Sequence, residues 1–545
     1  MIAARSMSRF MPANGCAGCG AGGNFVLERA AKLTGTGSRT GGLYSLTGVI
    51  GAVLLYSAFH IAARLIASAN LGEDDPLDVI LTQTLALGYR PGQPPLYDWL
   101  LWGLGQVLGP GALRFQVLKY GVLTATCGFM FLGARRVMKG DALWAFLSVE
   151  ALALIYQISW RFHEGFTHAV GAMCAVAALF WAMLRLVENR RSADYALFGL
   201  VAGLGLLTVT TVWVYLGALL GAACLQPALR RVILDRRIAL SAVVAALIAG
   251  PHFVWLAVAP GGLDAILPAW VSHPKHGHWY AVLLGIRRAF SEPIMYLSPL
   301  LFLFPLFFPG MLANVRRTVR LSANTSREPD YEQLILHLTL LNIAVLLAAA
   351  LVFGINRYPV HALMPLFLIT SIWLTAQARK AARGSWEVRR FVIMALSVAV
   401  FAFFARLANM YVLEPVCQIC RWGIPYAELA EGIRKTGFTQ GRIVVFDEEL
   451  GGNLKLFFPR AQVVLAGPKP YAPPPPQRLR FADTVYVWDG SESLEDAAKK
   501  FTLPHITTEA LAKAGTISIP WRRHYWKPDG YRVSEWRVLV TASGK

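Results

Sequence analysis

The sequence predicts a polytopic α-helical membrane protein, and three observations lead to that class. Hydrophobic residues make up 55% and charged residues 15% of the 545 residues, with a mean hydropathy of +0.47. That balance is too apolar for an ordinary soluble chain. Apolar windows of about 20 residues, long enough to cross a bilayer as a helix, recur along the chain. The net charge of +20 lies mostly in short loops between these windows, so it indicates membrane topology and not nucleic-acid binding.

The apolar windows predict about eleven transmembrane helices, within a range of eleven to thirteen. They lie near residues 44–66, 113–134, 142–159, 166–184, 194–208, 212–229, 238–258, 294–314, 332–353, 361–378 and 391–412. Every second loop between them is rich in Lys and Arg. Such short basic loops are typical of the cytoplasmic side. This pattern predicts a cytoplasmic N-terminus and places the long C-terminal segment on the outer face.

The chain divides into three predicted parts. Residues 1–42 form a Gly- and Ala-rich cytoplasmic tail that we expect to be disordered, residues 43–415 the transmembrane domain, and residues 416–545 an outer α/β domain. The predicted strands of that last domain are Arg442–Phe446, Gln462–Leu465, Thr484–Trp488, Thr516–Ile519 and Tyr531–Val540, and its helices include Glu448–Phe457 and Leu494–Phe501.

The first outer loop carries an unusual group of charges. Glu73, Asp74 and Asp75 follow the first apolar window directly. An amphipathic stretch, Leu77–Leu87, a tight turn and an aromatic stretch, Gln93–Trp102, come next. We expect two short helices on the membrane surface that hold the three carboxylates at the lipid boundary.

The second group of charges follows the third apolar window and contains Arg161, His163, Glu164 and His168. One interpretation places these side chains in the polar headgroup layer. The other treats them as a second cluster that faces the same cavity as the first loop, because ionisable groups at membrane depth usually line a polar site.

A third outer segment contains His273, His276 and His278 around Lys275. Three histidines within six residues suggest metal ligands, but a Pro and a Gly make the segment a turn, and this spacing is not a known zinc pattern. We favour a mobile gating loop that contacts an anionic substrate through Lys275.

A fourth outer link joins two late apolar windows and carries Arg357 and His361 beside a helix-breaking Pro. These residues either anchor the chain at the interface or contact substrate. Two C-x-x-C pairs, Cys16 with Cys19 and Cys417 with Cys420, could form a zinc site only if both lay on one side. The predicted topology separates them, so we predict no metal there and a local disulfide at the second pair.

The first outer loop resembles a known family. An acidic pair after the first window, then Gln83, Gly88-Tyr89 and Gln93-Pro94-Pro95-Leu96-Tyr97-Asp98-Trp99-Leu100, looks like the dolichyl-phosphate-mannose protein mannosyltransferase superfamily. More narrowly it resembles the bacterial branch, glycosyltransferase family 39 of the GT-C fold, which includes aminoarabinose and galacturonic acid transferases of lipid A. The resemblance covers roughly Tyr44 to Ala378, and the C-terminal domain matches only in placement.

The resemblance implies roles for individual residues. Asp74 corresponds to the proposed catalytic base, Asp75 to its acidic neighbour, and Glu73 is the alternative. Where the family often has a Lys that contacts the lipid phosphate, this chain has Gln93, which supplies hydrogen bonds without charge. Compensating cations and further substrate contacts would come from Arg90, Arg161 and Arg357, together with Tyr97, His163, Glu164, His168, Lys275 and His361.

The function implied is transfer of a sugar from a polyprenyl-phosphate donor to a lipid or glycan acceptor, such as lipid A, at the periplasmic face of the bacterial inner membrane. A carboxylate would take the acceptor proton and cationic groups would stabilise the departing phosphate. No cofactor is required, although the acidic triplet leaves room for a divalent cation. The alternative is a lipid or glycan transporter, or an assembly protein without catalysis. A transporter should show internal repeats and ionisable residues in the middle of its spans.

Overall fold

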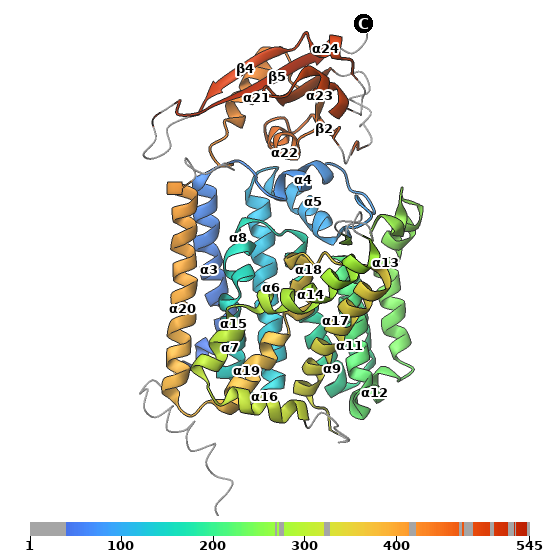
Figure 1. Ribbon diagram of the computed structural model, residues 1–545, viewed down its shortest axis with the longest axis vertical. Helices are drawn as coiled ribbons and strands as arrows, with labels where there is room; N and C mark the ends of the chain where they lie inside the picture. Colours follow the sequence, from blue (N-terminus) through green and yellow to red (C-terminus); the bar gives the residue numbers. More distant parts are fainter. Residues whose placement is uncertain are drawn as a thin grey trace, which may run out of the picture.

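The computed structural model describes residues 40–266, 270–271, 277–320, 328–413, 421–467, 471–473, 483–501, 506–521, 528 and 530–541. A bundle of helices forms its lower part, and a small α/β unit is stacked on one end of the bundle (Figure 1). Residues 1–39 of the expected N-terminal tail, Lys275 and both C-x-x-C pairs lie outside the described residues, whereas residues 40–42 belong to the short helix α2 (Thr40–Leu43).

Six helical segments of the described chain are long and apolar enough to cross a membrane. They are α3 (Leu46–Ala67), α6 (Leu113–Val137), α9 (His168–Asn189), α13 (Ile238–Val258), α17 (Tyr331–Phe353) and Ser385–Leu413, which joins α20 (Ser385–Ala408) to the π-helix η6 (Asn409–Leu413). The pair α18 (Val360–Phe367) and α19 (Thr370–Ala381), bent by 52°, gives a seventh if it counts as one span. The multi-pass helical class is therefore confirmed.

Shorter helices fill the remaining predicted windows. They include α7 (Ala142–Glu150) with the 3-10 turn η1 (Ala151–Leu154), α10 (Ser192–Leu206), α11 (Thr210–Cys224), α12 (Pro227–Ile233), α14 (His278–Leu297), α15 (Leu300–Phe307) and α16 (Met311–Arg320). The window at 294–314, predicted as one span, is divided among the last three of these. Pro299 and Pro309 lie in the two breaks, where the missing N–H and the ring of proline interrupt a helix.

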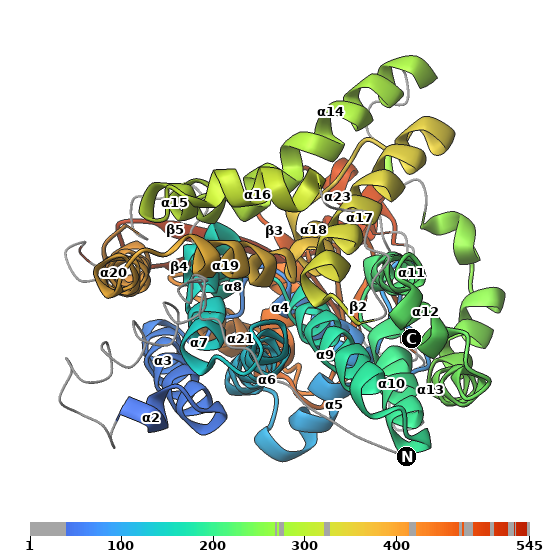
Figure 2. The ribbon, with the colours of Figure 1, turned by 90° about the horizontal axis from the view of Figure 1, so that it is seen from below.

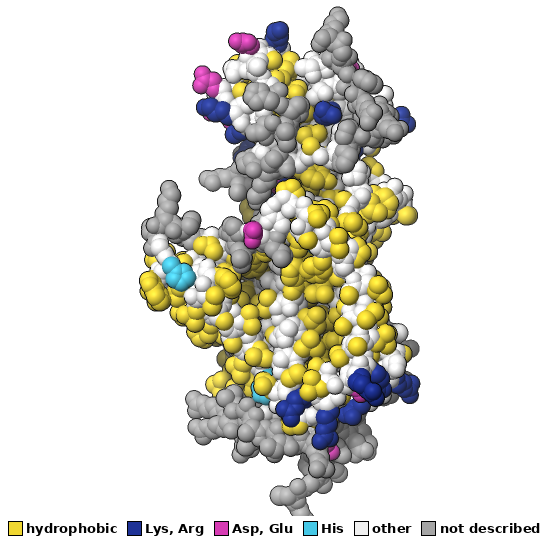
Figure 3. Space-filling model, turned by 90° about the vertical axis from the view of Figure 1, so that its right-hand side faces the viewer, with side chains coloured by type: hydrophobic (Ala, Val, Ile, Leu, Met, Phe, Trp, Pro, Cys, Tyr) yellow, Lys and Arg dark blue, Asp and Glu magenta, His cyan; other side chains and the backbone are white. Residues whose placement is uncertain are grey.

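An apolar belt surrounds the bundle. Large exposed hydrophobic side chains project from α3, α13 and α20, and Figure 2 shows α3 and α20 on one side of the bundle and α13 on the other. Figure 3 shows the belt on one face, with Lys and Arg gathered at the end opposite the α/β unit. An exposed apolar surface of this extent is what a lipid-facing helix requires.

The first outer loop forms two helices, as predicted. They are α4 (Asp75–Leu81) and α5 (Leu96–Leu108). The predicted first helix extended to Leu87, which was wrong, because the chain leaves the helix to pair with the α/β unit. The side-chain amide of Gln83 donates to the carbonyl of Val463 at 2.9 Å and accepts from its N–H at 2.8 Å.

The α/β unit contains a five-stranded sheet in the order β2-β1-β3-β5-β4. The strands are β1 (Arg442–Val445), β2 (Gln462–Leu465), β3 (Thr484–Asp489), β4 (Gly515–Pro520) and β5 (Val533–Thr541), and the helices are α21 (Tyr426–Lys435), α22 (Glu448–Phe457), α23 (Leu494–Lys500) and α24 (Thr508–Leu511). β1 is parallel to β2 and β3, while β5 is antiparallel to β3 and β4. All five strands coincide with predicted runs, which confirms the α/β pattern.

Helix α22 rests directly on α4. A Cβ at Gly452 would lie 2.3 Å from the carbonyl oxygen of Pro76, so only glycine permits this approach. Ile80 of α4 is fully buried in the hydrophobic core that α21 and α22 form with the sheet. The α/β unit is therefore packed onto the loop that carries the acidic triplet, and it fixes where that loop lies.

Candidate active site

The acidic triplet lies between α3 and α4, at the end of the bundle that faces the α/β unit (Figure 1). Asp74 precedes α4 and is exposed, whereas Asp75 begins the helix and is only 6% exposed. Burial raises the pKa of Asp75 to about 6, although the ammonium group of buried Lys119 on α6 opposes that shift. Asp74 is thus the accessible carboxylate, and Asp75 is a buried neighbour of raised pKa.

Glu73 is held by the α/β unit. Its backbone adopts the left-handed region, with φ of 57°, and its carboxylate forms a salt bridge with Arg421. Arg421 also donates to Glu449 of α22 at 2.9 Å. Burial lowers the pKa of Arg421, and the two neighbouring carboxylates more than reverse this, so the net pKa is raised. Because Glu73 is already paired, Asp74 is the better candidate for the base.

The second predicted cluster packs against the first. The π-helix η2 (Gln157–Arg161) and α8 (Phe162–Glu164) place Arg161 3.3 Å from Glu164. A Cβ at Gly165 would lie 3.4 Å from the Cβ of Glu73, so the two loops are in van der Waals contact. Burial raises the pKa of Glu164; Arg161 opposes the shift and the charge of Glu73 adds to it. The expectation that these loops share one site therefore has geometric support.

The link between α17 and α18 reaches the same place. The rings of Phe166 and His361 are 6.0 Å apart, and His361 lies within electrostatic reach of Asp74. Arg357 is exposed, and its backbone N–H donates to the carbonyl of Trp270 at 3.0 Å. Among the described residues no carboxylate pairs with the Arg357 guanidinium, so its charge is available to an anion.

The turn between α4 and α5 contacts the α/β unit. Arg90 lies 3.4 Å from the carboxylate of Glu448, and its carbonyl accepts the N–H of Gln93 at 3.1 Å. Gln93 itself is half-buried. Tyr97 is 2% exposed in α5, and within the described chain its hydroxyl has no hydrogen-bond partner. Of these three, Arg90 is engaged in an ion pair, and Tyr97 lies beneath the surface.

His163 is enclosed in a different environment. Its Nε2 is 2.6 Å from the hydroxyl of Tyr56, and its Nδ1 is 2.7 Å from the hydroxyl of Tyr120. Arg406 of α20 donates to the carbonyl of His163 at 2.8 Å and to Nδ1 of His60 at 2.9 Å. Both ring nitrogens of His163 are therefore occupied within the bundle, and its predicted substrate contact gains no support from this placement.

The structure adds three charged residues that sequence reasoning did not single out. Asp78 of α4 and Asp98 of α5 are each 1% exposed and lie beside His168, and Lys119 is 1% exposed in α6. Burial raises the pKa of Asp98 well above its ordinary range, and His168 opposes that shift. Two features of the sequence could have identified such residues. Asp78 is one helical turn beyond Asp74 and Asp75, and Lys119 is a cation inside an apolar window.

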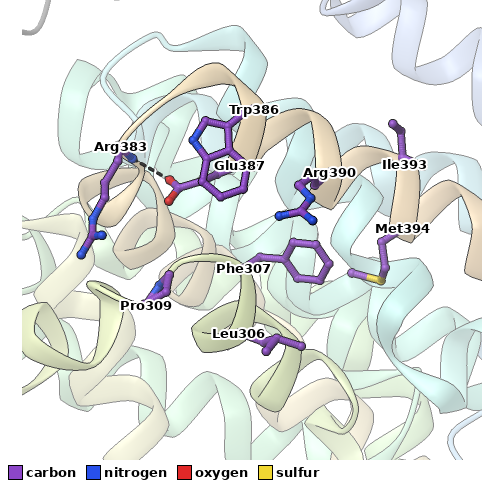
Figure 4. Close-up of a pocket in the computed structure, with 9 residues that line it drawn as sticks. All are labelled: Leu306, Phe307, Pro309, Arg383, Trp386, Glu387, Arg390, Ile393 and Met394. Carbon is purple, nitrogen blue, oxygen red and sulfur yellow. Dashed lines mark hydrogen bonds between the residues drawn. The ribbon is translucent and has the colours of Figure 1, made fainter.

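A separate pocket lies at the other end of the bundle. Its volume is about 590 Å³, and it lies between the end of α15 and the start of α20, with Arg383, Glu387 and Arg390 as its charged lining residues (Figure 4). Figure 1 shows α4, which follows the acidic triplet, at the end of the bundle that carries the α/β unit, and the start of α20 at the opposite end. The pocket therefore takes no part in the site described above.

Comparison with known proteins finds one matching family model and relatives that cover most of the chain. The family model described as dolichyl-phosphate-mannose-protein mannosyltransferase matches residues 92–255. Two curated relatives from Rhizobium johnstonii are the lipopolysaccharide core galacturonosyltransferases RgtB and RgtA. RgtB is 24% identical over 86% of this chain and 92% of its own length, and RgtA is 26% identical over 91% and 96%.

Two solved structures of ArnT from Cupriavidus metallidurans share the architecture. The one bound to undecaprenyl phosphate has a TM-score of 0.58 and 15% identity and covers 91% of this chain and 99% of its own. The apo state has a TM-score of 0.56 and 14% identity and covers 90% and 98%. The resemblance found in the first outer loop is confirmed: over most of its length the chain is similar in sequence to galacturonosyltransferases, and it shares its fold with ArnT.

Proposed function

We propose that this glycosyltransferase moves a sugar from a polyprenyl-phosphate donor to a lipid or glycan acceptor, such as lipid A or another envelope glycoconjugate. The galacturonosyltransferase names of its relatives support an envelope acceptor, and the undecaprenyl phosphate bound to ArnT supports the donor class. The apolar belt beside the site is compatible with a donor that enters from the membrane (Figure 3).

The proposed topology has eleven spans, with the site and the α/β domain in the periplasm. Shorter apolar helices such as Ser192–Leu206 and Thr210–Cys224 would then also cross the membrane. The gathering of Lys and Arg at the end opposite the α/β domain supports a cytoplasmic face there (Figure 3). We keep the predicted divisions at 1–42, 43–415 and 416–545, with the first part a cytoplasmic tail.

One observation carries the mechanism: Asp74 is an exposed carboxylate beside buried Asp75, while the neighbouring Glu73 is paired. In the proposed step the acceptor hydroxyl attacks the anomeric carbon of the donor sugar, and Asp74 takes the hydroxyl proton. The bond from that carbon to the phosphate oxygen breaks, and polyprenyl phosphate leaves with the electron pair. Arg357, which is exposed and pairs with no carboxylate among the described residues, would stabilise that phosphate.

The remaining predicted contacts keep more limited proposed roles. Glu164 with Arg161, and His361, would bind sugar or acceptor, and Gln93 would donate a hydrogen bond to the donor phosphate. Arg90 and Glu73 would act by holding the loop against the α/β domain. No cofactor is required for this step, because the leaving phosphate carries its own charge.

The test measures polyprenyl-phosphate sugars and envelope glycolipids by mass spectrometry in cells with and without the protein. We expect a lipid-linked sugar to accumulate in its absence and one envelope glycan to lack that sugar. Asp74→Asn should give the same phenotype at normal expression, because a general base contributes about 100-fold or more to the rate. Asp264→Asn removes an exposed carboxylate elsewhere on the chain and should behave as wild type.

The opposite outcomes favour the alternative. If lipid-linked sugars and glycans are unchanged without the protein, transport or assembly would account for it better than transfer. If loss of the protein gives the expected changes but Asp74→Asn is fully active, the transferase function is supported and the assignment of Asp74 as its base is wrong.

A further inference from the structure

The strongest feature outside the proposed mechanism is a buried group that we name the carboxylate site: Asp78 of α4, Asp98 of α5 and His168 of α9. One ligand atom from each residue lies within 4.8 Å of the others. The Nε2 of His168 is 3.6 Å from an oxygen of Asp78 and 3.6 Å from an oxygen of Asp98. The three side chains are 1%, 1% and 6% exposed.

Within the described chain, none of the six polar atoms of the carboxylate site has a hydrogen-bond partner. A separation of 3.6 Å is too long for a hydrogen bond. The hydroxyl of neighbouring Tyr97, whose ring centroid is 5.2 Å from that of His168, also lacks a partner. Buried polar atoms are satisfied in the great majority of cases, so a group this incomplete points to a missing ligand.

We propose that the carboxylate site binds one divalent transition-metal ion, with zinc as the best match. Two carboxylate oxygens and one imidazole nitrogen are donors that zinc accepts, at bond lengths of about 2.0–2.2 Å. Tetrahedral ligands at such distances lie about 3.4 Å apart, close to the two separations of 3.6 Å. Small side-chain movements would therefore complete the site.

Charge balance favours a metal over a proton. Two ionised carboxylates with a neutral imidazole carry a charge of −2, which a divalent cation cancels, whereas protonation of His168 cancels only half of it. The guanidinium of Arg114 on α6 lies within electrostatic reach of Asp78, but no hydrogen bond or ion pair joins them in the described structure. A buried site without net charge is the less costly arrangement.

The ion would act by holding elements together. Its ligands come from both juxtamembrane helices and from a membrane-spanning helix, so binding would fix α4 and α5 to α9. Asp75 lies one turn before Asp78 on the same helix, so the metal would also position the acidic triplet. The inference does not depend on the proposed function, because metal content is measured on the protein itself.

The test uses the full-length protein, purified in detergent without a metal-affinity tag and treated with EDTA. Zinc is then added and excess ion removed, and mass spectrometry counts the bound metal. We expect about one zinc per chain and a higher unfolding temperature on zinc addition. Asp98→Asn and His168→Gln should each lower zinc affinity at least about 100-fold, since both remove a direct ligand.

A matched control replaces Asp194, a buried carboxylate that is paired with Arg185 at 2.6 Å. Asp194→Asn should keep the full metal content. A variant with Ser at Cys16, Cys19, Cys417 and Cys420 and Gln at His273, His276 and His278 should also keep it, which excludes the other candidate ligands. Cobalt gives a second readout, because its visible spectrum should change in His168→Gln.

Two results would overturn the inference. One is a wild-type protein that takes up no stoichiometric zinc, cobalt or manganese after EDTA treatment, which would leave a protonated His168 between the two carboxylates. The other is metal that persists in both ligand variants. Wild-type uptake and thermal stabilisation decide the question even if the variants fail to fold.

Discussion

Two buried polar clusters lie within the same membrane protein, and they differ in how far their hydrogen bonds are satisfied. We name the first the histidine network: Tyr56, His60, Tyr120, His163 and Arg406. Bonds of 2.6–2.9 Å join both nitrogens of His163, one nitrogen of His60 and two atoms of Arg406 to partners. In the carboxylate site no such bond occurs among the described residues.

The two clusters use their buried polar groups in different ways. The histidine network ties α3, α6, α8 and α20 together with groups that satisfy one another, apart from Nε2 of His60, so it should stabilise the bundle without any ligand. The carboxylate site holds two buried carboxylates that only His168, 3.6 Å away, and more distant Arg114 can compensate, and no hydrogen bond joins them in the described protein, so it should cost stability until a ligand binds. Stability measurements on matched variants can therefore tell the two clusters apart.

The largest effect is expected in the histidine network. Arg406→Met removes the donor to His60 and to the carbonyl of His163, and it leaves both buried acceptors without a partner. Hydrogen bonds to a charged group contribute about 1.5–3 kcal/mol each, so we expect the free energy of unfolding to fall by about 3 kcal/mol. Thermal unfolding in detergent measures the change.

The control for this variant is Arg136→Met, which breaks an exposed ion pair with Glu188 at 2.9 Å. Such pairs contribute about 0–1 kcal/mol, so the control should unfold close to wild type. Equal losses in the two variants would show that the histidine network does not have the stabilising role assigned to it.

A substitution in the carboxylate site of the metal-free protein should change the free energy of unfolding in the opposite direction. In metal-free protein, Asp98→Asn removes a buried charge that has no hydrogen bond, so we expect stability to rise by about 1–2 kcal/mol. With zinc present, the same substitution should lower stability relative to wild type because a ligand is lost. Unfolding curves with EDTA and with zinc measure both signs. A large loss in EDTA would show that a charged His168 already compensates Asp98.

The sequence could predict most of the fold because its signals are local. Apolar windows mark where helices form, and alternation with turn residues marks all five strands. The prediction of one span over residues 294–314 was wrong, because it rested on apolar composition and gave too little weight to the prolines in that window. Helix α4 was predicted too long because Gln83 bonds to Val463, 380 residues further along, and no local pattern reports such a contact.

The candidate site was predictable only in part. Asp74, Asp75 and Glu164 belong to loops with visible charge clusters, and the structure brings those loops together. The partner of Glu73 was not visible, since Arg421 is 348 residues away. His168 was grouped with His163 on proximity in sequence, yet the two lie in different clusters because α9 begins between them.

Substitution of Asp75 should have an intermediate effect on the free energy of unfolding. Its pKa of about 6, raised from an ordinary 3.8 by burial, means that the folded protein holds this proton more tightly than the unfolded chain does. Stability from this group is therefore highest at low pH and is lost as pH rises through about 4 to 6. Wild type should lose about 1 kcal/mol relative to Asp75→Asn between about pH 5 and pH 7.

This pH dependence is measured by unfolding in EDTA, so that no bound cation acts on the carboxylate. Asp489→Asn, an exposed substitution on β3, is the control and should follow the wild-type profile. Parallel wild-type and Asp75→Asn profiles would show that Lys119 cancels the effect of burial.

The smallest expected effect on stability is at the contact between the acidic triplet and the α/β domain. Arg421→Gln breaks the salt bridges to Glu73 and Glu449, whose side chains are 30% and 33% exposed, so solvent screens both. We expect a loss below about 1 kcal/mol. Hydrogen exchange should nevertheless rise at residues 72–75, because Arg421 joins that loop to α22. Lys380→Gln, which breaks a similar pair with Glu332, should cost as little and leave this exchange unchanged. If Arg421→Gln also leaves it unchanged, the packing of Gly452 against Pro76 is sufficient to position the candidate base.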